Sequence, residues 1–490
     1  MLKLLFLVHR WLGILLGLVM LLWCLSGFVM MYKPYPELTE SQKLSTFSEL
    51  SLQGCCNPGD WQPVADDQYT QFSLQMSGGN LLLNMEGPAG SQLLDARTGQ
   101  PYARVDVTAA RQHANSFSES RNLGVPVSLG SIHNDQWTVY GAYNPDRPLY
   151  KFASGDEAGT QWYVSSRDGS IVQITTHEQR VWAWLGAVIH WLYPTLLREH
   201  VALWSQTVIW LTIFGIFLTL TGLYFGLRQY RSGKSGLTPY KGLSAWHHYT
   251  GLLFGILTLS WVFSGLFSMN PWGLLEGEGA RIESALIEGG SLSSEEILSV
   301  LGELEGRSLP AGTVKLEGRR LLGSIRLFAV DAASTRTVLD MNTLQPKPLP
   351  VDTFKRISDL LGGEVPELLE TEDAYYYHHH EKVQLPAWRI ISASESRTRY
   401  YLSPETGSIL GKIDTEKRWY RWLFYGLHRG DFTATLRSRP LWDLFMWTLL
   451  LGVTATCFTG FCMGVRRLQL KAGRSRRRSI SRTNPGLVRG

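Results

Sequence analysis

The strongest constraint on this chain is an apolar segment at residues 4–32 that has a second copy at residues 244–271. When the two copies are aligned, His9 in the first matches His247 in the second. Leucine matches carry no weight because apolar helices resemble one another. Histidine, glycine, tryptophan and serine matches at one constant offset carry much more. An ionisable histidine in a membrane-spanning helix is costly and is therefore a candidate functional residue. The other matches are Gly13 with Gly251, Gly17 with Gly255, Trp23 with Trp261, and Ser26-Gly27 with Ser264-Gly265.

The same offset relates residues outside these two segments. His190 closes the sequence WLGAVIH, and His428 closes WLFYGLH at the corresponding position of the second half. A period kept over this distance predicts a tandem duplication of the chain. Further matches are Trp204 with Trp442, Thr221-Gly222 with Thr459-Gly460, Gly226 with Gly464, and residues 162–165 with 400–403.

Four apolar stretches are each long enough to cross a bilayer core of roughly 30 Å. They cover residues 4–32, 202–227, 245–269 and 442–465. The first is too long for a secretory signal and carries His9 and Arg10 near its start. Because no small-residue cleavage site follows it, we interpret it as a retained anchor.

Basic residues predict the orientation of these helices. The N-terminus, the loop 228–244 and the tail from Arg466 carry 15 Lys or Arg and no acidic residue, while the rest of the chain nets −10. The positive-inside rule places these three parts in the cytoplasm, with the chain in a bacterial inner membrane. Beside a membrane helix, we interpret the basic tail as a topology signal that meets anionic lipid headgroups, and not as a nucleic-acid site.

The two long regions between the membrane segments are expected in the periplasm. Short runs of alternating polarity, bounded by Gly, Asn and Asp, predict antiparallel strands in both. In the first region the strands are expected at 69–76, 80–85, 92–95, 135–143, 149–153, 161–164 and 171–174, with a helix at 107–117. In the second they are expected at 312–316, 324–329, 337–340, 387–392, 399–402 and 408–413, with helices near Ser294 and at 352–361.

The predicted fold class is therefore a membrane α+β protein in which a membrane helix, an external α+β region and a second membrane helix occur twice. The predicted order is membrane segment 1–32, periplasmic region 33–200, membrane segment 201–227, cytoplasmic loop 228–244, membrane segment 245–270, periplasmic region 271–440, membrane segment 441–465 and cytoplasmic tail 466–490.

Two conspicuous features receive no assigned role. The vicinal pair Cys55-Cys56 is external and open to oxidation, and the other cysteines, Cys24, Cys457 and Cys462, lie in apolar stretches where cysteine is a small apolar residue. The run 375–381, YYYHHHE, fits a solvated loop or sheet edge. It also fits a face that docks a metal or a substrate, and the sequence leaves both interpretations open.

The four repeat-related histidines are expected at two depths. His9 and His247 begin their helices near the cytoplasmic face, whereas His190 and His428 each precede a helix that enters from outside. At a rise of about 1.5 Å per residue, one helix length separates the levels, so no cofactor can use one histidine from each. Two copies in the same orientation imply a pseudo-twofold axis along the membrane normal. That axis places His9 opposite His247, and His190 opposite His428, across two flat cofactors.

Imidazole is a common iron ligand, and two axial histidines suit electron transfer. The alternative for each histidine is a structural hydrogen bond at a helix end. Glycines spaced four apart follow each inner histidine, at 13 and 17 and at 251 and 255, and they either admit a macrocycle edge or let two helices pack closely. His248 adjoins His247, and only the repeat register selects His247 as the ligand.

The ordered motifs resemble a known family. A strand followed by a turn with Thr-Gly, as in LDARTG at 94–99 and YLSPETG at 401–407, resembles the PepSY module. The remaining motifs resemble PepSY-associated transmembrane proteins; they are HRWLG at 9–13, DAYYY at 373–377, LPAWR at 385–389, and Trp422-Leu423 leading to Leu427-His428. The resemblance covers nearly the whole chain. The resemblance implies that the chain is a reductase of the di-haem, inner-membrane, ferric-siderophore type. It also implies two b-type haems held by His9, His247, His190 and His428.

The expected function is thus the transfer of electrons across the membrane to a periplasmic ferric siderophore, which then releases Fe(II). The cytoplasmic parts are too short for a flavin or nicotinamide domain, so the electrons must come from a separate cytoplasmic flavoprotein or from membrane quinol. No catalytic residue beyond the haem ligands is assigned. The rival interpretation is a non-enzymatic, membrane-anchored PepSY protein that binds a partner. A transporter is disfavoured because acidic residues are nearly absent from the spans.

Overall fold

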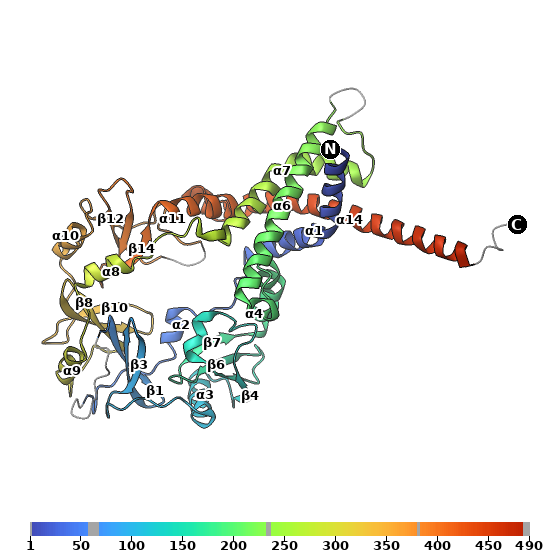
Figure 1. Ribbon diagram of the computed structural model, residues 1–490. Helices are drawn as coiled ribbons and strands as arrows, with labels where there is room; N and C mark the ends of the chain where they lie inside the picture. Colours follow the sequence, from blue (N-terminus) through green and yellow to red (C-terminus); the bar gives the residue numbers. More distant parts are fainter. Residues whose placement is uncertain (1, 57–67, 232–236, 380–382, 484–490) are drawn as a thin grey trace. The chain divides into compact units, whose positions relative to one another are not determined.

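The computed structural model describes residues 2–56, 68–231, 237–379 and 383–483, with backbone only for 473–483. The described chain divides into two compact units. The helical unit contains Met1–Tyr35, Val181–Glu276 and Trp419–Gly490, and the sheet unit contains Pro36–Arg180 and Gly277–Arg418. Each unit therefore draws on both halves of the sequence (Figure 1).

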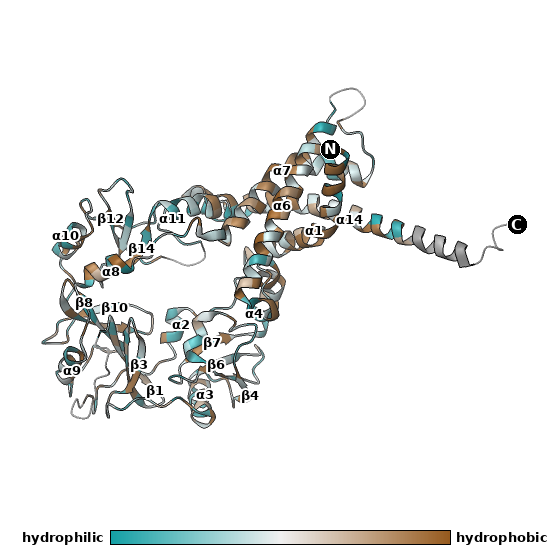
Figure 2. Cartoon of the chain, viewed as in Figure 1, coloured by the Kyte–Doolittle hydropathy of each residue, from teal (hydrophilic) through white to brown (hydrophobic). Residues whose placement is uncertain are grey.

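The helical unit is built on α1 (Leu2–Met30), α6 (Val201–Gln229), α7 (Leu243–Ser268) and α14 (Leu441–Thr483). These are four helices long and apolar enough to cross a membrane, at the predicted places, and they fit a multi-pass membrane protein. Between 28% and 33% of their most apolar windows is buried within the protein. Exposed large apolar residues occur on all four helices, which suits contact with lipid tails. Figure 2 shows the hydrophobic residues of these helices in brown.

The four membrane helices pack in a ring, because α1 contacts α6 and α14, and α7 contacts the same two helices. Two short π-helices accompany them: η3 (Trp184–Val188) packs on α1, and η5 (Arg421–Gly426) packs on α7. A π-helical turn inside a helix commonly marks a functional site. The helical unit also contains the short helices α5 (Thr195–Arg198), η4 (Pro271–Gly273), α12 (Leu427–Arg429) and α13 (Ala434–Arg437).

The sheet unit contains a six-stranded antiparallel sheet in the order β10-β9-β8-β1-β2-β3. Two three-stranded meanders, one from each half of the sequence, meet along β1 and β8, where Leu74 lies opposite Leu316. Both leucines are fully buried in the core on one face of the sheet. The strands are β1 (Gln71–Ser77), β2 (Asn80–Gly87), β3 (Gly90–Asp95), β8 (Thr313–Leu321), β9 (Ser324–Asp331) and β10 (Arg336–Leu339).

Two four-stranded antiparallel sheets complete this unit. In one, Phe117 of α3 (Val107–Arg121) packs on Trp162; in the other, Phe354 of α10 (Val351–Leu360) stacks on Trp388. The first sheet contains β4 (Val127–Ile132), β5 (Leu149–Ala153), β6 (Gln161–Ser165) and β7 (Ile171–Thr175). The second contains β11 (Glu367–Leu369), β12 (Ala387–Ile391), β13 (Arg399–Leu402) and β14 (Ile409–Ile413).

The remaining helices are short. Within the sheet unit they are α2 (Glu40–Leu44), α8 (Arg281–Glu288), α9 (Ser294–Gly302) and the 3-10 helix η2 (Gly141–Asp146). The helices α4 (His177–Ala183) and α11 (Thr415–Tyr420) span the points where the chain passes from the sheet unit into the helical unit. Capping boxes at Thr39 and Ser293 fix where α2 and α9 begin.

One predicted strand, 135–143, is wrong. Asp135 instead begins a turn, in which its carboxylate accepts hydrogen bonds from the Trp137 amide and the Thr138 hydroxyl, and η2 follows. The strand that pairs with β5 is β4, which the sequence pattern missed because Gly130 interrupts its alternation. The short edge strand β11 was missed as well. The other predicted strands and helices are confirmed within a few residues at their ends.

The two features without an assigned role are placed as follows. Cys55 and Cys56 form a disulfide within the core of the six-stranded sheet. In the YYYHHHE run, Tyr375 and Tyr376 form a turn on Asp373, while residues 380 and 381 lie outside the described residues.

Candidate functional site

The outer histidine pair follows the two π-helices. His190 lies just after η3, and its Nδ1 is 3.1 Å from both the Trp23 carbonyl oxygen and the Ser26 hydroxyl of α1. His428 lies just after η5, and its Nδ1 is 3.1 Å from the Ser264 hydroxyl of α7 and faces the Trp261 carbonyl. Each contact of His190 thus recurs at His428 with the repeat-related partner.

The two outer rings lie at the spacing that one shared metal ion requires. Their centroids are 6.1 Å apart, and their planes are inclined by 71°. A metal–imidazole nitrogen bond is about 2 Å long and the ring centroid lies about 1 Å beyond that nitrogen, so rings on opposite sides of one metal have centroids about 6 Å apart. Each ring can rotate about its own metal–nitrogen bond, so the inclination is compatible with this arrangement.

The inner histidines are held in the same way by other helices. His9 of α1 places Nδ1 at 3.1 Å from both the Leu218 carbonyl oxygen and the Thr221 hydroxyl of α6. His247 of α7 makes the corresponding contacts to Thr456 and Thr459 of α14, also at 3.1 Å. His9 lies near enough to His247 for the two rings to interact electrostatically.

These contacts decide which ring nitrogen is available. A carbonyl oxygen can only accept, so each Nδ1 that faces one must carry the proton. In a neutral imidazole Nε2 then presents a lone pair, which is the form that binds a metal. No hydrogen-bond partner for Nε2 of these four histidines is found in the part of the chain that the structure describes.

Glycines lie against the histidine rings. A Cβ atom at Gly222 would lie 2.9 Å from Cε1 of His9, and one at Gly460 would lie 3.0 Å from Cε1 of His247. Any side chain at these two positions would therefore displace the inner rings. At the outer pair, Gly27 and Gly265 would place a Cβ 3.9 and 3.7 Å from the histidine rings.

The glycines that follow the inner histidines divide into two kinds. A Cβ at Gly17 would lie 3.5 Å from the Phe461 backbone, and one at Gly255 would lie 2.6 Å from Leu223. These two glycines therefore serve close packing between helices. A Cβ at Gly251 would meet nothing within 4 Å, and one at Gly13 would only touch Leu218 at 3.9 Å. Gly13 and Gly251 thus leave open space one turn after each inner histidine.

The neighbouring histidines behave differently. His248, which the sequence left as a rival to His247, turns its Nε2 to the Gly226 carbonyl oxygen at 2.8 Å. That nitrogen is therefore engaged, and only His247 reproduces the contacts of His9. His200 precedes α6 with an exposed side chain, 3.8 Å from Glu199.

The two pairs lie at different levels of the helical unit. On α1, the inner His9 lies in the first part of the helix, whereas Ser26, which contacts the outer His190, lies in its last part. At about 1.5 Å per residue, roughly 25 Å of helix separates the levels. Along this distance lie Trp23, Trp261 and the Cys24–Cys457 pair, whose sulfur atoms are 3.8 Å apart.

The histidine pairs need further ligands to bind a metal ion. In the described ranges, no group of three or more His, Cys, Asp or Glu side chains is arranged to hold one. Two imidazoles would supply two ligands, and the nitrogens of a porphyrin would supply the rest. The donor set and the ring spacing at the outer level therefore fit a haem.

Four residues missed as functional are the hydroxyl partners of the rings. Ser26, Ser264, Thr221 and Thr459 were matched at the repeat offset, but nothing in the sequence indicates which histidine each one contacts. No known family model matches the chain, and no curated protein matches it.

Proposed function

We propose that this protein is a di-haem membrane oxidoreductase of the PepSY-associated transmembrane type, which carries electrons across a bacterial inner membrane to a ferric siderophore. The observation that supports it most is the pair of outer imidazoles, 6.1 Å apart, with Nδ1 of each engaged by helix α1 or α7. A histidine that only stabilised a helix end would not require a second imidazole at this spacing.

In this proposal the haem supplies reversible one-electron chemistry, and the protein holds and orients it. His190 and His428 would be the axial ligands near the periplasmic face, and His9 and His247 those near the cytoplasmic face. The carbonyl and hydroxyl partners keep each Nδ1 protonated, which raises the basicity of the ligating nitrogen. The helices exclude water around the sites, and Gly13 and Gly251 leave room beside the inner pair.

The direction of transfer in the proposal follows from charge. The basic N-terminus, loop and tail would face the cytoplasm, where a flavoprotein donates electrons, unless membrane quinol does so from within the bilayer. The sheet unit would then face the periplasm and meet the ferric chelate. Siderophores built for Fe(III) hold Fe(II) weakly, so one electron suffices to release the metal.

The first experiment is optical. The full chain, purified in detergent from a haem-producing bacterial host, is expected to show b-type bands in a reduced-minus-oxidised spectrum, with two haems per chain. The matched control is the double variant His190→Ala, His428→Ala, which should keep one haem. A colourless protein would refute the proposal and leave the membrane-anchored binding protein as the better interpretation.

The second experiment tests direction. Liposomes that contain the protein and an enclosed, impermeant reductant are mixed with an external ferric siderophore and an Fe(II) indicator. Indicator colour is expected with the intact protein and not with the double variant or with empty liposomes. Reduction that proceeds equally fast in the double variant would contradict the proposed route.

A further inference from the structure

A cavity of about 190 Å³ lies in the sheet unit, and its lining residues do not include the four histidines. It is formed by α8, the end of β8 and the turn between β13 and β14. Its apolar wall comes from Ile287, Leu321 and Ile409. Gly407 belongs to the turn and has a φ of +69°, and a Cβ there would lie 3.0 Å from Leu321. The turn can therefore approach β8 only because residue 407 is a glycine.

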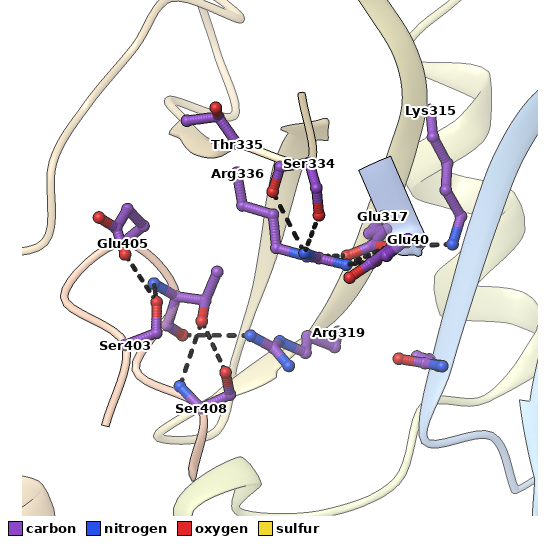
Figure 3. Close-up of polar contacts among 12 residues, drawn as sticks. Glu40, Lys315, Glu317, Arg319, Ser334, Thr335, Arg336, Ser403, Glu405 and Ser408 are labelled. Atoms are coloured by element: carbon purple, nitrogen blue, oxygen red, sulfur yellow. Dashed lines mark hydrogen bonds and ion pairs between the residues drawn. The ribbon is translucent and has the colours of Figure 1, made fainter. Parts of the chain in front are cut away.

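Arg319 lines this cavity, and no carboxylate among the described residues forms an ion pair with it. On the same face of β8, Glu317 is already engaged, because its carboxylate accepts from Lys315 and from Arg336, each at 3.0 Å. Figure 3 shows the Arg319 side chain directed toward the turn that carries Ser403 and Ser408, apart from the cluster around Arg336. In the described structure its contacts are the Thr406 carbonyl oxygen at 3.4 Å and the Phe328 ring at 4.8 Å.

Glu288, at the end of α8, lines the same cavity and also lacks an ion pair in the described structure. It lies near enough to Arg319 for the two charges to interact, but no ion pair within 4.0 Å joins them. Burial raises the pKa of Glu288, and the charge of Arg319 partly offsets that rise. Burial likewise lowers the pKa of Arg319. Two opposite charges thus share one cavity, each partly desolvated, at a cost that a complementary ligand would reduce.

Hydroxyl groups in the cavity lining provide a further hydrogen-bond donor. The hydroxyls of Thr406 and Ser408 lie 2.7 Å apart, so one donates to the other and the acceptor keeps its own hydrogen available. Ser284 contributes another hydroxyl to the lining. The cavity is smaller than the roughly 300 Å³ at which pockets for drug-sized ligands begin, so its occupant must be small.

We propose that this cavity binds a small zwitterion, whose carboxylate meets Arg319 and whose ammonium group meets Glu288, as in a free α-amino acid. The planar guanidinium matches a carboxylate with two parallel hydrogen bonds. Arg320 also lines the cavity, but its guanidinium is already engaged by Glu296 and by the Ser291 and Gly323 carbonyl oxygens. Among the described lining residues, the charges left without an ion pair are Arg319 and Glu288, and this combination distinguishes a zwitterion from a simple anion. This inference does not depend on the haem proposal.

The test is calorimetric titration of the full chain in detergent with L-alanine, and with acetate and methylamine as half-ligands. Saturable binding of alanine is expected, with acetate and methylamine each at least tenfold weaker. Arg319→Gln and Glu288→Gln should each weaken alanine binding at least tenfold. Arg281→Gln, on the exposed start of α8 and outside the cavity lining, is the matched control and should leave binding unchanged.

Folding is checked by the thermal unfolding of each variant, and Arg319→Lys supplies a second readout. This variant keeps the positive charge but loses the two parallel N–H donors of the guanidinium. Its affinity for alanine should therefore lie between those of the intact protein and of Arg319→Gln. Acetate that binds as tightly as alanine would overturn the zwitterion assignment. No saturable binding of alanine, or binding insensitive to both Arg319→Gln and Glu288→Gln, would overturn the site itself.

Discussion

The helical and sheet units differ in how well residues 238 positions apart keep the same contacts. In the helical unit, the contacts of His9 to α6 recur at His247 to α14 with the same atoms and the same 3.1 Å distances. In the sheet unit, the charged cluster of Lys315, Glu317 and Arg336 has no charged counterpart at this offset, where Ser77, Gly79 and Thr98 stand instead.

Intermediate cases in the sheet unit clarify this difference. Tyr163 bonds Asp135 as its repeat counterpart Tyr401 bonds Asp373, but the basic partner is Lys151 in the first and Arg389 in the second. These partly buried ion pairs tolerate that exchange. Under the haem proposal, an imidazole that shares a group with a second imidazole does not, because a change on one side misplaces the other. We therefore predict that substitutions at the histidine pairs act on cofactor binding, and that substitutions in the sheet unit act on stability.

The largest expected effect comes from removing a single imidazole. If the outer pair holds a haem as proposed, His428→Ala should weaken its binding and reduce the haem per chain by up to half, because the group loses one of its two protein ligands. His247→Ala should abolish the inner haem and leave the outer one. Haem is measured by extraction against protein concentration, and His200→Ala is the control that should keep both haems. Equal losses from His200→Ala would contradict the proposal that His9, His247, His190 and His428 are the histidines that hold haem.

A smaller effect is expected when the inner ring is pushed aside. Gly460→Ala would place a methyl group 3.0 Å from Cε1 of His247, so the imidazole ring would have to move. We expect the inner haem content to fall by more than half and the outer haem to be unaffected, as resolved by redox titration. Gly464→Ala, one turn further along α14, is the control, since its Cβ would only meet Ile14 at 3.5 Å. The idea fails if both variants lose haem equally.

A weaker effect is expected from the hydroxyl partners. Ser264→Ala and Thr459→Val each leave a carbonyl acceptor near the histidine, so haem affinity should drop about tenfold, the lower end for such partners. The measurement is the rate of haem transfer to an apo-globin acceptor. Ser268→Ala, an exposed serine on α7 that bonds only the Gly265 carbonyl, should not change the rate. An unchanged rate in Ser264→Ala would mean that the carbonyl alone orients the ring.

Substitutions in the sheet unit are expected to leave the haem content unchanged and to alter the free energy of unfolding instead. Glu317→Gln should lower the free energy of unfolding by about 1–3 kcal/mol, because it leaves Lys315 without its carboxylate and leaves Arg336 with Glu40 alone. Ser73→Ala, at the facing position on β1, should change it by about 0.5 kcal/mol or less. Chemical denaturation of the full chain checks both, and a haem loss in Glu317→Gln would contradict the division between the units.

The same carboxylate predicts a dependence on pH. Burial raises the pKa of Glu317, but the charges and hydrogen bonds of Lys315 and Arg336 outweigh it, so the pKa lies below its usual value. A lowered pKa in the folded state means that this stabilisation is complete above the unfolded-state pKa of about 4.3 and is lost as the pH falls toward the folded-state value. Chemical denaturation at a series of acidic pH values measures this loss, and Glu317→Gln should lack this part of the acid sensitivity.

The sequence predicted the apolar helices and the proximity of His190 to His428 because these signals are local or strictly periodic. Apolar length sets each span, and one offset sets each partner. It did not predict that β1 and β8 join the two halves into one sheet, because edge pairing depends on three-dimensional placement. The pocket around Arg319 was missed for a similar reason, since α8, β8 and the turn at Gly407 are distant in sequence. Nor could apolar pattern alone separate Gly17, which packs on a backbone, from Gly251, which faces open space.

The ladder between β1 and β8 and the helix contacts join the two halves of the chain in a similar way. The ladder runs antiparallel between the first strand of each meander, which is how identical subunits meet across a twofold axis. In the helical unit α1 packs on α14 and α6 packs on α7, so each half supplies one helix to each contact. The covalent link between the halves therefore acts as a tether, which fixes their ratio at one to one and keeps their effective concentration high.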